Sequence, residues 1–106
     1  MKLVTAYLHR VRTAEVVQAL ADAGYRNLVF ADVRGTLPGI SDDERDYSSE
    51  GAGIVIGEVR LDLVCRDSEV AAVAAVIRGH AVIGSRISGW VYISTIDEAL
   101  PIGGGS

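Results

Sequence analysis

Hydrophobic and polar residues alternate along four segments of the chain, and this period of two predicts four β-strands. The segments are Leu3 to His9, Asn27 to Arg34, Ile54 to Cys65 and Gly89 to Ile96. The third segment divides into an apolar and a more polar side, formed by Val59, Leu61, Leu63 and Cys65 and by Glu58, Arg60, Asp62 and Val64. We therefore expect the third strand to present one apolar face and one polar face.

Two further segments repeat apolar residues at helical spacing. The first begins at Thr13, a residue suited to N-capping, and stops at Gly24, with apolar positions at Val16, Val17, Ala19, Leu20 and Ala23. The second begins at Asp67 or Ser68 and stops at Gly79, with apolar positions at Val70, Val73, Ala74 and Ile77. The sequence thus predicts one helix after the first strand and one after the third.

The predicted order is strand, helix, strand, and the same unit follows again. The two halves correspond when shifted by about 54 positions, which matches Thr5, Tyr7 and His9 with Val59, Leu61 and Leu63. Such a double unit is typical of an α+β, ferredoxin-like βαββαβ sandwich, in which two helices cover one face of a four-stranded antiparallel sheet. We expect one domain over residues 1–102, a flexible tail over 103–106, and self-association through the uncovered sheet face.

A long polar loop, Gly35 to Gly57, separates the second and third predicted strands. Loops beyond about 12–15 residues are uncommon in compact domains and are usually functional. The loop is rich in Gly, Ser and Asp and has no apolar periodicity, so we expect it to be poorly ordered without a ligand. Its length predicts a binding loop.

The overall composition narrows the class of protein. The chain has 106 residues, 49% hydrophobic and 23% charged, with only short apolar runs, which predicts a soluble globular protein without membrane insertion. The formal net charge of −4 disfavours nucleic acid as a partner, because affinity for a phosphate backbone needs clustered cations. The N-terminus lacks an export pattern, so we expect a cytoplasmic location. The single cysteine, Cys65, is predicted to be a buried small hydrophobic residue.

Residues suited to catalysis or metal binding are few, so neither an enzyme nor a metal site is predicted. His9 and His80 are the only histidines, and they fall at a strand end and at a helix end. Neighbouring carboxylates occur in an exposed polar run, without the apolar surroundings of a general acid: Asp42, Asp43, Glu44 and Asp46.

Anion binding has more support in the sequence. All but one of the ten cationic side chains are arginines, which suit bidentate pairing with phosphate or carboxylate groups. Gly35 and Gly39 allow successive backbone N–H groups at the start of the loop to face an anion. A second polar turn, Gly84 to Gly89, contains Arg86, and Arg60 lies close to the end of the third strand. Two such turns could enclose a phosphate.

Several segments of the chain together form a recognisable pattern: the first strand, "ALADAGY", "VRG", the long loop, "GEVRLDLVC" and "IGSRISGWVYI". In these segments, over nearly its full length, the chain resembles the PII signal-transduction family. The resemblance implies a homotrimer of ferredoxin-like subunits that holds adenine nucleotides in clefts between neighbours. It also implies that residues 35–57 form a T-loop, which contacts effectors and a protein target and is ordered by them.

The chain departs from the family pattern at several ligand-binding positions. In the second signature, Gly-x-x-Gly-Asp-Gly-Lys, Gly84 and Gly89 fit, whereas the inner Gly, Asp and Lys are replaced by Ile87, Ser88 and Trp90. Glycines replace the glutamine for magnesium and oxoglutarate and the uridylylated tyrosine, at Gly39 and Gly51. Glu58 replaces a phosphate-side lysine, and "LPIGGGS" lacks the family's C-terminal arginines. The resemblance therefore implies ADP or AMP in preference to magnesium ATP, and it disfavours oxoglutarate.

The resemblance maps a nucleotide site onto particular residues of this chain. Its adenine side corresponds to Val29, Asp62, Leu63 and Val64, and its phosphate side to Gly35, Thr36, Leu37, Ser88 and Gly89. Charge adds Arg60 and Arg86. The chain is similar to a divergent group associated with carboxysomes and bicarbonate transport, which implies a bicarbonate site at Gly35, Thr36 and Arg60. The target of the T-loop would then be a transporter or a carbon-metabolism protein.

Other proteins with the same order of elements remain alternatives. An ACT-type regulatory domain binds small metabolites, and a small trimeric metal-binding protein of the copper-tolerance type shares the architecture, but neither accounts for the long loop. An RNA-recognition module needs stacking aromatic residues on its middle strands, whereas this chain has one Phe and a net negative charge. An enzyme of this fold would need a nucleophile or a general base, and no residue is a clear candidate.

Overall fold

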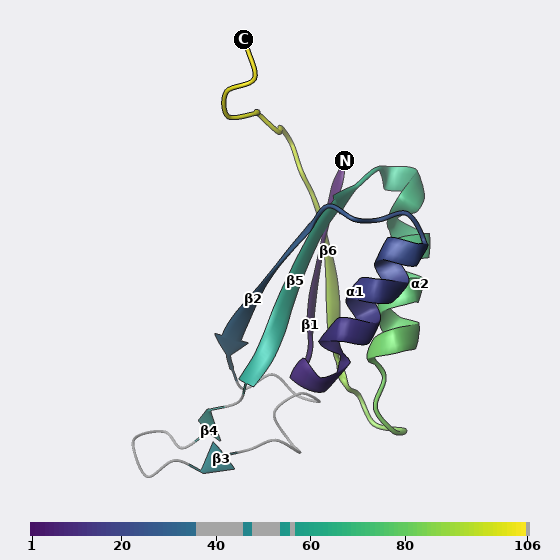
Figure 1. Ribbon diagram of the computed structural model, residues 1–106, viewed down its shortest axis with the longest axis vertical. Coiled ribbons are helices and arrows are strands. Elements are labelled where there is room, and N and C mark those ends of the chain that lie inside the picture. Colours follow the sequence, from purple (N-terminus) through teal and green to yellow (C-terminus); the bar gives the residue numbers. More distant parts are fainter. Residues whose placement is uncertain (36–45, 48–53, 56, 106) are drawn as a thin grey trace.

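The protein is a two-layer α/β sandwich in which two helices cover one face of a four-stranded sheet (Figure 1). The computed structural model describes residues 1–35, 46–47, 54–55 and 57–105. The sandwich is built from β1 (Lys2–His9), α1 (Thr13–Asp22), β2 (Leu28–Arg34), β5 (Gly57–Cys65), α2 (Val70–Ala81) and β6 (Gly89–Thr95). This is the βαββαβ order that the sequence predicts, and the ferredoxin-like fold is confirmed.

The sheet has the strand order β2-β5-β1-β6, with β5 and β1 in its centre. Every neighbouring pair is antiparallel. In the register, Tyr7 of β1 lies opposite both Arg60 of β5 and Trp90 of β6. Because directly opposed residues share a face of an antiparallel sheet, these three side chains belong to one face. The same rule assigns every other position to the helix-covered face or to the open face.

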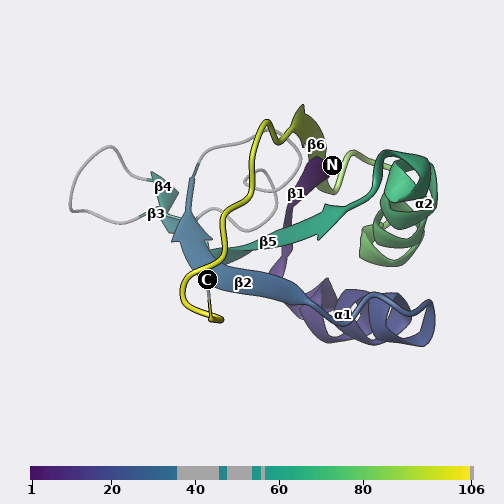
Figure 2. The same cartoon turned by 90° about the horizontal axis from the view of Figure 1, so that it is seen from above.

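The core lies between the helices and the two central strands. Figure 2 shows α1 and α2 on the same side of the sheet. The buried side chains come from alternate positions of β1 and β5 and from one stripe on each helix, and they are Val4, Ala6, Leu8, Leu61, Leu63, Cys65, Val16, Leu20, Val73, Ile77 and Ala81. The helices cover the edge strands less completely than the central strands. Phe30 of β2 and Ile93 of β6 face the helix layer but remain about half exposed.

The predicted correspondence of the two halves is wrong by one position. Val4, Ala6 and Leu8 face the helices in β1, whereas Thr5 and Tyr7 belong to the open face. The offset of about 54 matched Thr5, Tyr7 and His9 with the buried residues Val59, Leu61 and Leu63. Since side chains alternate along a strand, a shift of one residue exchanges the two faces. The buried faces of β1 and β5 therefore correspond one position further along the chain, whereas the helices need a larger offset, because Val16 and Leu20 of α1 match Val73 and Ile77 of α2.

The ends of the helices agree only partly with the sequence prediction. Gly24 ends α1 as predicted, with φ +97° and with Tyr25 N–H donating to the Leu20 carbonyl at 2.8 Å. The predicted stop at Gly79 is wrong, because α2 continues to Ala81. The predicted caps are also wrong. Thr13 is the first residue of α1 and not its N-cap, and Asp67 and Ser68 lie in a 3₁₀ turn, Asp67–Glu69, that precedes α2.

The loop between β2 and β5 is largely outside the described residues, and the prediction of its disorder falls there. Two described pieces, β3 (Asp46–Tyr47) and β4 (Ile54–Val55), pair as a two-stranded antiparallel sheet. The loop therefore contains strand residues, although its sequence shows no apolar periodicity. The prediction that Ile54 starts the third strand is wrong, because β5 begins at Gly57. Tyr47, Ile54 and Val55 in these pieces are of residue types that are enriched in β-strands.

No helix in the described part of the chain is long and apolar enough to cross a membrane. Residues 96–105 follow β6 without helix or strand, and Figure 1 shows this segment running away from the sandwich. Its apolar side chains Leu100 and Ile102 are exposed.

Cys65 lies in the core at the end of β5, as the sequence predicts. Burial raises the pKa of its thiol, and the carboxylates of Glu69 and Asp67 add to this effect. We expect the thiol of the folded protein to react with a disulfide reagent at least about tenfold more slowly than in denaturant, because the thiolate is the reactive form. Equal rates of colour development in native buffer and in guanidinium would contradict this prediction.

Candidate functional site

Four strand ends meet at the edge of the sheet where the long loop leaves β2. The register places Val33 opposite Glu58, Glu58 opposite His9, and Leu8 opposite Gly89. Glu58 is only 1% exposed and His9 only 4%, so both are buried although they lie on the face without helices. A polar pair buried at the base of a long loop is unusual for a surface sheet edge, and this end of the sheet is therefore the first candidate site.

Two glycines at this edge allow close approach of neighbouring groups. A Cβ at Gly35 would lie 2.5 Å from Oε1 of Glu58, so the carboxylate packs directly against the glycine. A Cβ at Gly89 would overlap the carbonyl oxygen of Tyr7, and Gly89 has φ +154°. Both turns that the sequence proposes as anion-binding turns are therefore packed against the sheet through a glycine.

The open face of β5 carries a chain of polar contacts. Arg60 Nε donates to Asp62 Oδ2 at 3.0 Å, and the Thr5 hydroxyl donates to Asp62 Oδ1 at 2.6 Å. Asp62 thus holds Arg60 on one side and the neighbouring strand on the other. The Arg60 side chain remains partly exposed, so its other N–H groups can reach a ligand above the sheet.

Three aromatic side chains from β1 and β6 form a cluster on the same open face of the sheet. The rings of Trp90 and Tyr92 are stacked with centroids 6.4 Å apart, and Tyr7 meets Tyr92 edge-to-face at 6.0 Å. Trp90 is 36% exposed and Tyr92 46% exposed in the single chain. An exposed aromatic cluster on an uncovered sheet face is typical of an interface.

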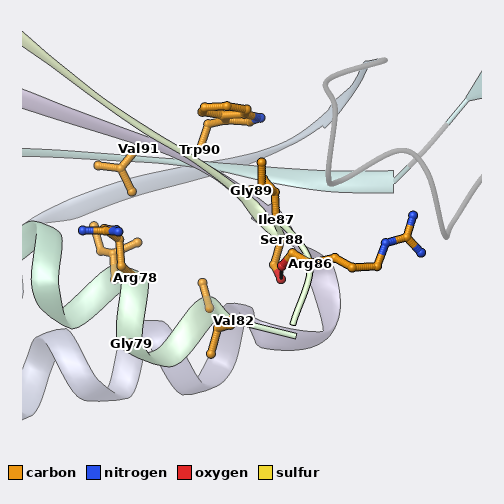
Figure 3. A pocket seen from close by; sticks show the side chains of 11 residues that line it. Arg78, Gly79, Val82, Arg86, Ile87, Ser88, Gly89, Trp90 and Val91 are labelled. Carbon is orange, nitrogen blue, oxygen red and sulfur yellow. Dashed lines mark hydrogen bonds between the residues drawn. The ribbon is translucent and has the colours of Figure 1, made fainter. Parts of the chain in front are cut away.

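A cavity of about 580 Å³ lies beside the edge strand β6, between the end of α2 and the turn that precedes the strand (Figure 3). Its volume falls within the range of roughly 300–1,000 Å³ that is common for small-molecule sites. The lining is mostly apolar, with cationic side chains at Arg78 and Arg86. In Figure 3 the Arg86 side chain extends away from Arg78, so the two guanidinium groups do not converge on one point.

The turn beside this cavity is fixed by one hydroxyl group. Ser88 Oγ accepts the N–H of Ile83 at 2.8 Å and lies 3.0 Å from the Ile83 carbonyl and 3.1 Å from the Arg86 carbonyl. These contacts occupy the hydroxyl, so the Ser88 side chain shapes the turn, and its backbone is the part that can meet a ligand.

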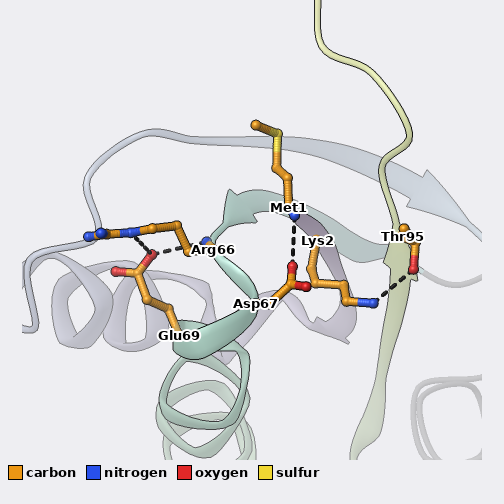
Figure 4. A network of polar contacts seen from close by, with 6 residues as sticks. All are labelled: Met1, Lys2, Arg66, Asp67, Glu69 and Thr95. Carbon is orange, nitrogen blue, oxygen red and sulfur yellow. Dashed lines mark hydrogen bonds and ion pairs between the residues drawn. The ribbon is translucent and has the colours of Figure 1, made fainter.

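The other end of the sheet carries a group of polar contacts, one of which is an ion pair between segments distant in sequence (Figure 4). The N-terminal amino group donates to Asp67 at 2.7 Å, and this hydrogen bond holds the pKa of the Asp67 carboxyl below its usual range. Glu69 accepts the backbone N–H of Arg66 at 3.0 Å, which lowers the pKa of the Glu69 carboxyl. Lys2 Nζ donates to Thr95 at 2.8 Å. These contacts connect β1, β6 and the start of α2, and they serve the fold.

The residues predicted from the sequence fall into two groups on opposite sides of β1 in the sheet. Val29 lies on the edge strand β2, Gly35 directly follows that strand, and Arg60, Asp62 and Val64 lie on its central neighbour β5. Arg86, Ser88 and Gly89 belong to the edge formed by β6. With neighbouring strands about 4.8 Å apart, β6 is roughly 14 Å from β2 and roughly 10 Å from β5, so one chain alone does not bring the two groups into contact.

Three of the predicted residues need separate comment. The Leu63 side chain points into the core and is buried, so it cannot contact a ligand on the open face. Thr36 and Leu37 lie outside the described residues. Sequence reasoning missed Arg78, which lines the cavity. Its position near the end of α2, just before the predicted turn from Gly84 to Gly89, was the available signal.

Within residues 1–35, 46–47, 54–55 and 57–105, no group of three or more His, Cys, Asp or Glu side chains has the arrangement of a metal site.

Comparison with known proteins identifies the family. The chain is 31% identical, over 107 aligned residues, to the nitrogen fixation nifHD2 region GlnB-like protein 1 of Methanosarcina barkeri, and the alignment covers 99% of this chain and 96% of that protein. The chain belongs to the GlnB-like, or PII, family. It is also 32% identical to the nifHD region GlnB-like proteins 1 of Methanococcus maripaludis and Methanobacterium ivanovii, over 96% of this chain and 93% of each relative. No family model matches the chain.

Membership of the PII family confirms the resemblance seen in the sequence. The alignments extend over nearly the whole chain, including the long loop and the turn before β6. At about one-third identity, the departures at Glu58, Ser88 and Trp90 mark this chain as a divergent PII protein. The family does not by itself assign a ligand to these altered positions.

Proposed function

We propose that this PII-family protein is a regulator that binds ADP or AMP in clefts between the protomers of a homotrimer. The observation that carries the proposal is the division of the predicted ligand residues between the β2 and β5 side of the sheet and its β6 edge. When the β2 and β5 edge of one protomer faces the β6 edge of the next, both groups of residues line a single cleft. A site of this kind is incomplete in the single chain.

The chemistry of the two edges suits the two ends of a nucleotide. Val29 and Val64 give exposed apolar surface for a base, and Asp62 gives a carboxylate that can accept from an exocyclic amino group. The guanidinium groups of Arg60 and Arg86 suit a phosphate, because charge-assisted and bidentate hydrogen bonds are stronger than neutral ones. Gly35 and Gly89 allow the backbone to approach a phosphate closely.

Signalling would pass through the loop that joins β2 to β5 beside one half of the site. Gly35, the last described residue before the loop, packs against Glu58 at the edge where we place the phosphates. A ligand that binds there favours one loop arrangement in proportion to its differential affinity for the two. We propose that the loop then meets a protein target. The names of the relatives refer to nitrogen-fixation regions, so nitrogen metabolism is a further candidate context beside bicarbonate and inorganic carbon.

We expect Arg86→Ala and Arg60→Ala each to weaken ADP or AMP binding by roughly ten- to a hundredfold, because a lost charge-assisted contact costs about 1.5–3 kcal/mol. Titration calorimetry with AMP, ADP, ATP, cyclic nucleotides and bicarbonate measures the effect and identifies the ligand. Arg26→Ala removes the same charge from the exposed turn after α1 and should leave the affinity unchanged.

The same titrations test the proposal as a whole. If the folded wild-type protein binds no adenine nucleotide, the nucleotide proposal is wrong. If it binds one and neither arginine variant weakens the complex, only the assignment of the phosphate is wrong. Amino acids serve as the comparison ligands, since an ACT-type domain would bind these instead.

A further inference from the structure

We propose that Glu58 limits how many phosphates the bound nucleotide can carry, so that the site prefers AMP to ATP. This inference rests on the nucleotide site proposed above and adds a specificity-determining residue to it. It follows from the order of charges along β5 and from the burial of one carboxylate.

The open face of β5 presents its side chains in a fixed sequence. Val64, Asp62, Arg60 and Glu58 occupy alternate positions, each opposite a residue of β1 on the same face. Alternate residues of a strand lie about 6.6–6.8 Å apart. A nucleotide with its base beside Val64 and Asp62 therefore has Arg60 near its first phosphate, and any further phosphate extends toward Glu58.

Glu58 cannot move aside as a surface carboxylate would. Its side chain is 1% exposed, and Oε1 packs against Gly35, which directly follows β2. His9, 4% exposed, occupies the facing position on β1. The carboxylate is thus held between two strands at the edge where the phosphates would leave the sheet. Like charges repel more strongly in a buried environment than in water, and salt screens them less.

The wild-type protein itself supplies the first test. In calorimetry without magnesium at constant ionic strength, AMP should bind at least about tenfold more tightly than ATP, with ADP between them, because each added phosphate brings more charge toward Glu58. Affinities that are equal, or that increase with the number of phosphates, overturn the inference and leave nucleotide binding itself intact.

Substitution of the carboxylate gives the second test. Glu58→Gln keeps the shape of the side chain and removes its charge, so the ratio of AMP to ATP affinity should fall toward one, and Glu58→Lys should reverse the ratio. Glu15→Gln, on the exposed surface of α1, is the matched control for net charge and should keep the wild-type ratio. If Glu58→Gln folds, as circular dichroism reports, and retains the wild-type ratio, the inference is wrong. If neither Glu58 variant folds, the wild-type series decides.

Absence of all nucleotide binding is a separate result. A folded wild-type protein that binds none of AMP, ADP and ATP overturns the proposed function, and the inference about Glu58 with it. Binding with an unaltered ratio in the variants overturns the inference about Glu58 alone.

Discussion

Tyr92→Asp is expected to convert a homotrimer of the 11.2 kDa chain into monomers. Tyr92 is the middle ring of the open-face aromatic cluster, edge-to-face with Tyr7 and stacked with Trp90. If this face forms the interface between protomers, the substitution places a carboxylate in an apolar contact on every protomer. Burying an unpaired charge costs at least several kcal/mol. An interface of ordinary size cannot lose that much free energy of association and remain formed.

The measurement is light scattering after size-exclusion chromatography at micromolar concentration. Val11→Asp is the matched control, because Val11 is 73% exposed beside α1 and away from the open face. The control should remain a trimer, and Tyr92→Phe should as well, since it keeps the ring. A monomeric wild-type protein, or a trimeric Tyr92→Asp variant, would show that this face is not the interface.

The sequence predicts the strands and helices well because each has a clear period, but it does not decide which side of β1 faces the helices. Both sides of that strand carry apolar or aromatic residues, Val4, Ala6 and Leu8 on one and Leu3 and Tyr7 on the other. Only the pairing of β1 with β5 and β6 makes the choice. The same ambiguity produced the wrong offset between the two halves.

The ends of α2 show a second limit of sequence reasoning. A glycine after a helical stripe is a good stop signal when it adopts positive φ, as Gly24 does. Gly79 continues the helix, and Gly84 is the residue with positive φ in the following turn. Nothing in the neighbouring sequence distinguishes the two kinds of glycine, because the difference is made by the packing of the turn against β6.

The candidate site was only partly predictable. Glycines and arginines near strand ends were found from their chemistry and from the PII resemblance, and the structure describes most of them. Their division between opposite sides of β1 in the sheet depends on strand order, which a linear sequence does not display. The burial of Glu58 was not predicted either, because a charged residue next to a polar loop has the pattern of an exposed one.

Gly89→Ala is expected to destabilise the fold by about 3 kcal/mol or more. Gly89 has φ +154°, which L-residues rarely adopt, and a Cβ there would overlap the Tyr7 carbonyl of a central strand. That carbonyl cannot retreat without disturbing the pairing of β1 with β6. For a domain of this size, the loss corresponds to a decrease in Tm of roughly 10 °C or more, measured by thermal unfolding at one protein concentration.

Gly79→Ala is the control that separates backbone strain from the simple addition of a methyl group. A Cβ at Gly79 meets no atom within 4 Å, and the residue lies inside α2. Because alanine favours a helix interior over glycine, this variant should gain about 0.5–1 kcal/mol. If Gly89→Ala lowers the stability of the fold and Gly79→Ala raises it, the loss of stability comes from backbone strain in the turn before β6, where we also place a phosphate. A Gly89→Ala protein as stable as the wild type would mean that the turn can rearrange, and the close approach of Gly89 to Tyr7 would then not be required for the fold.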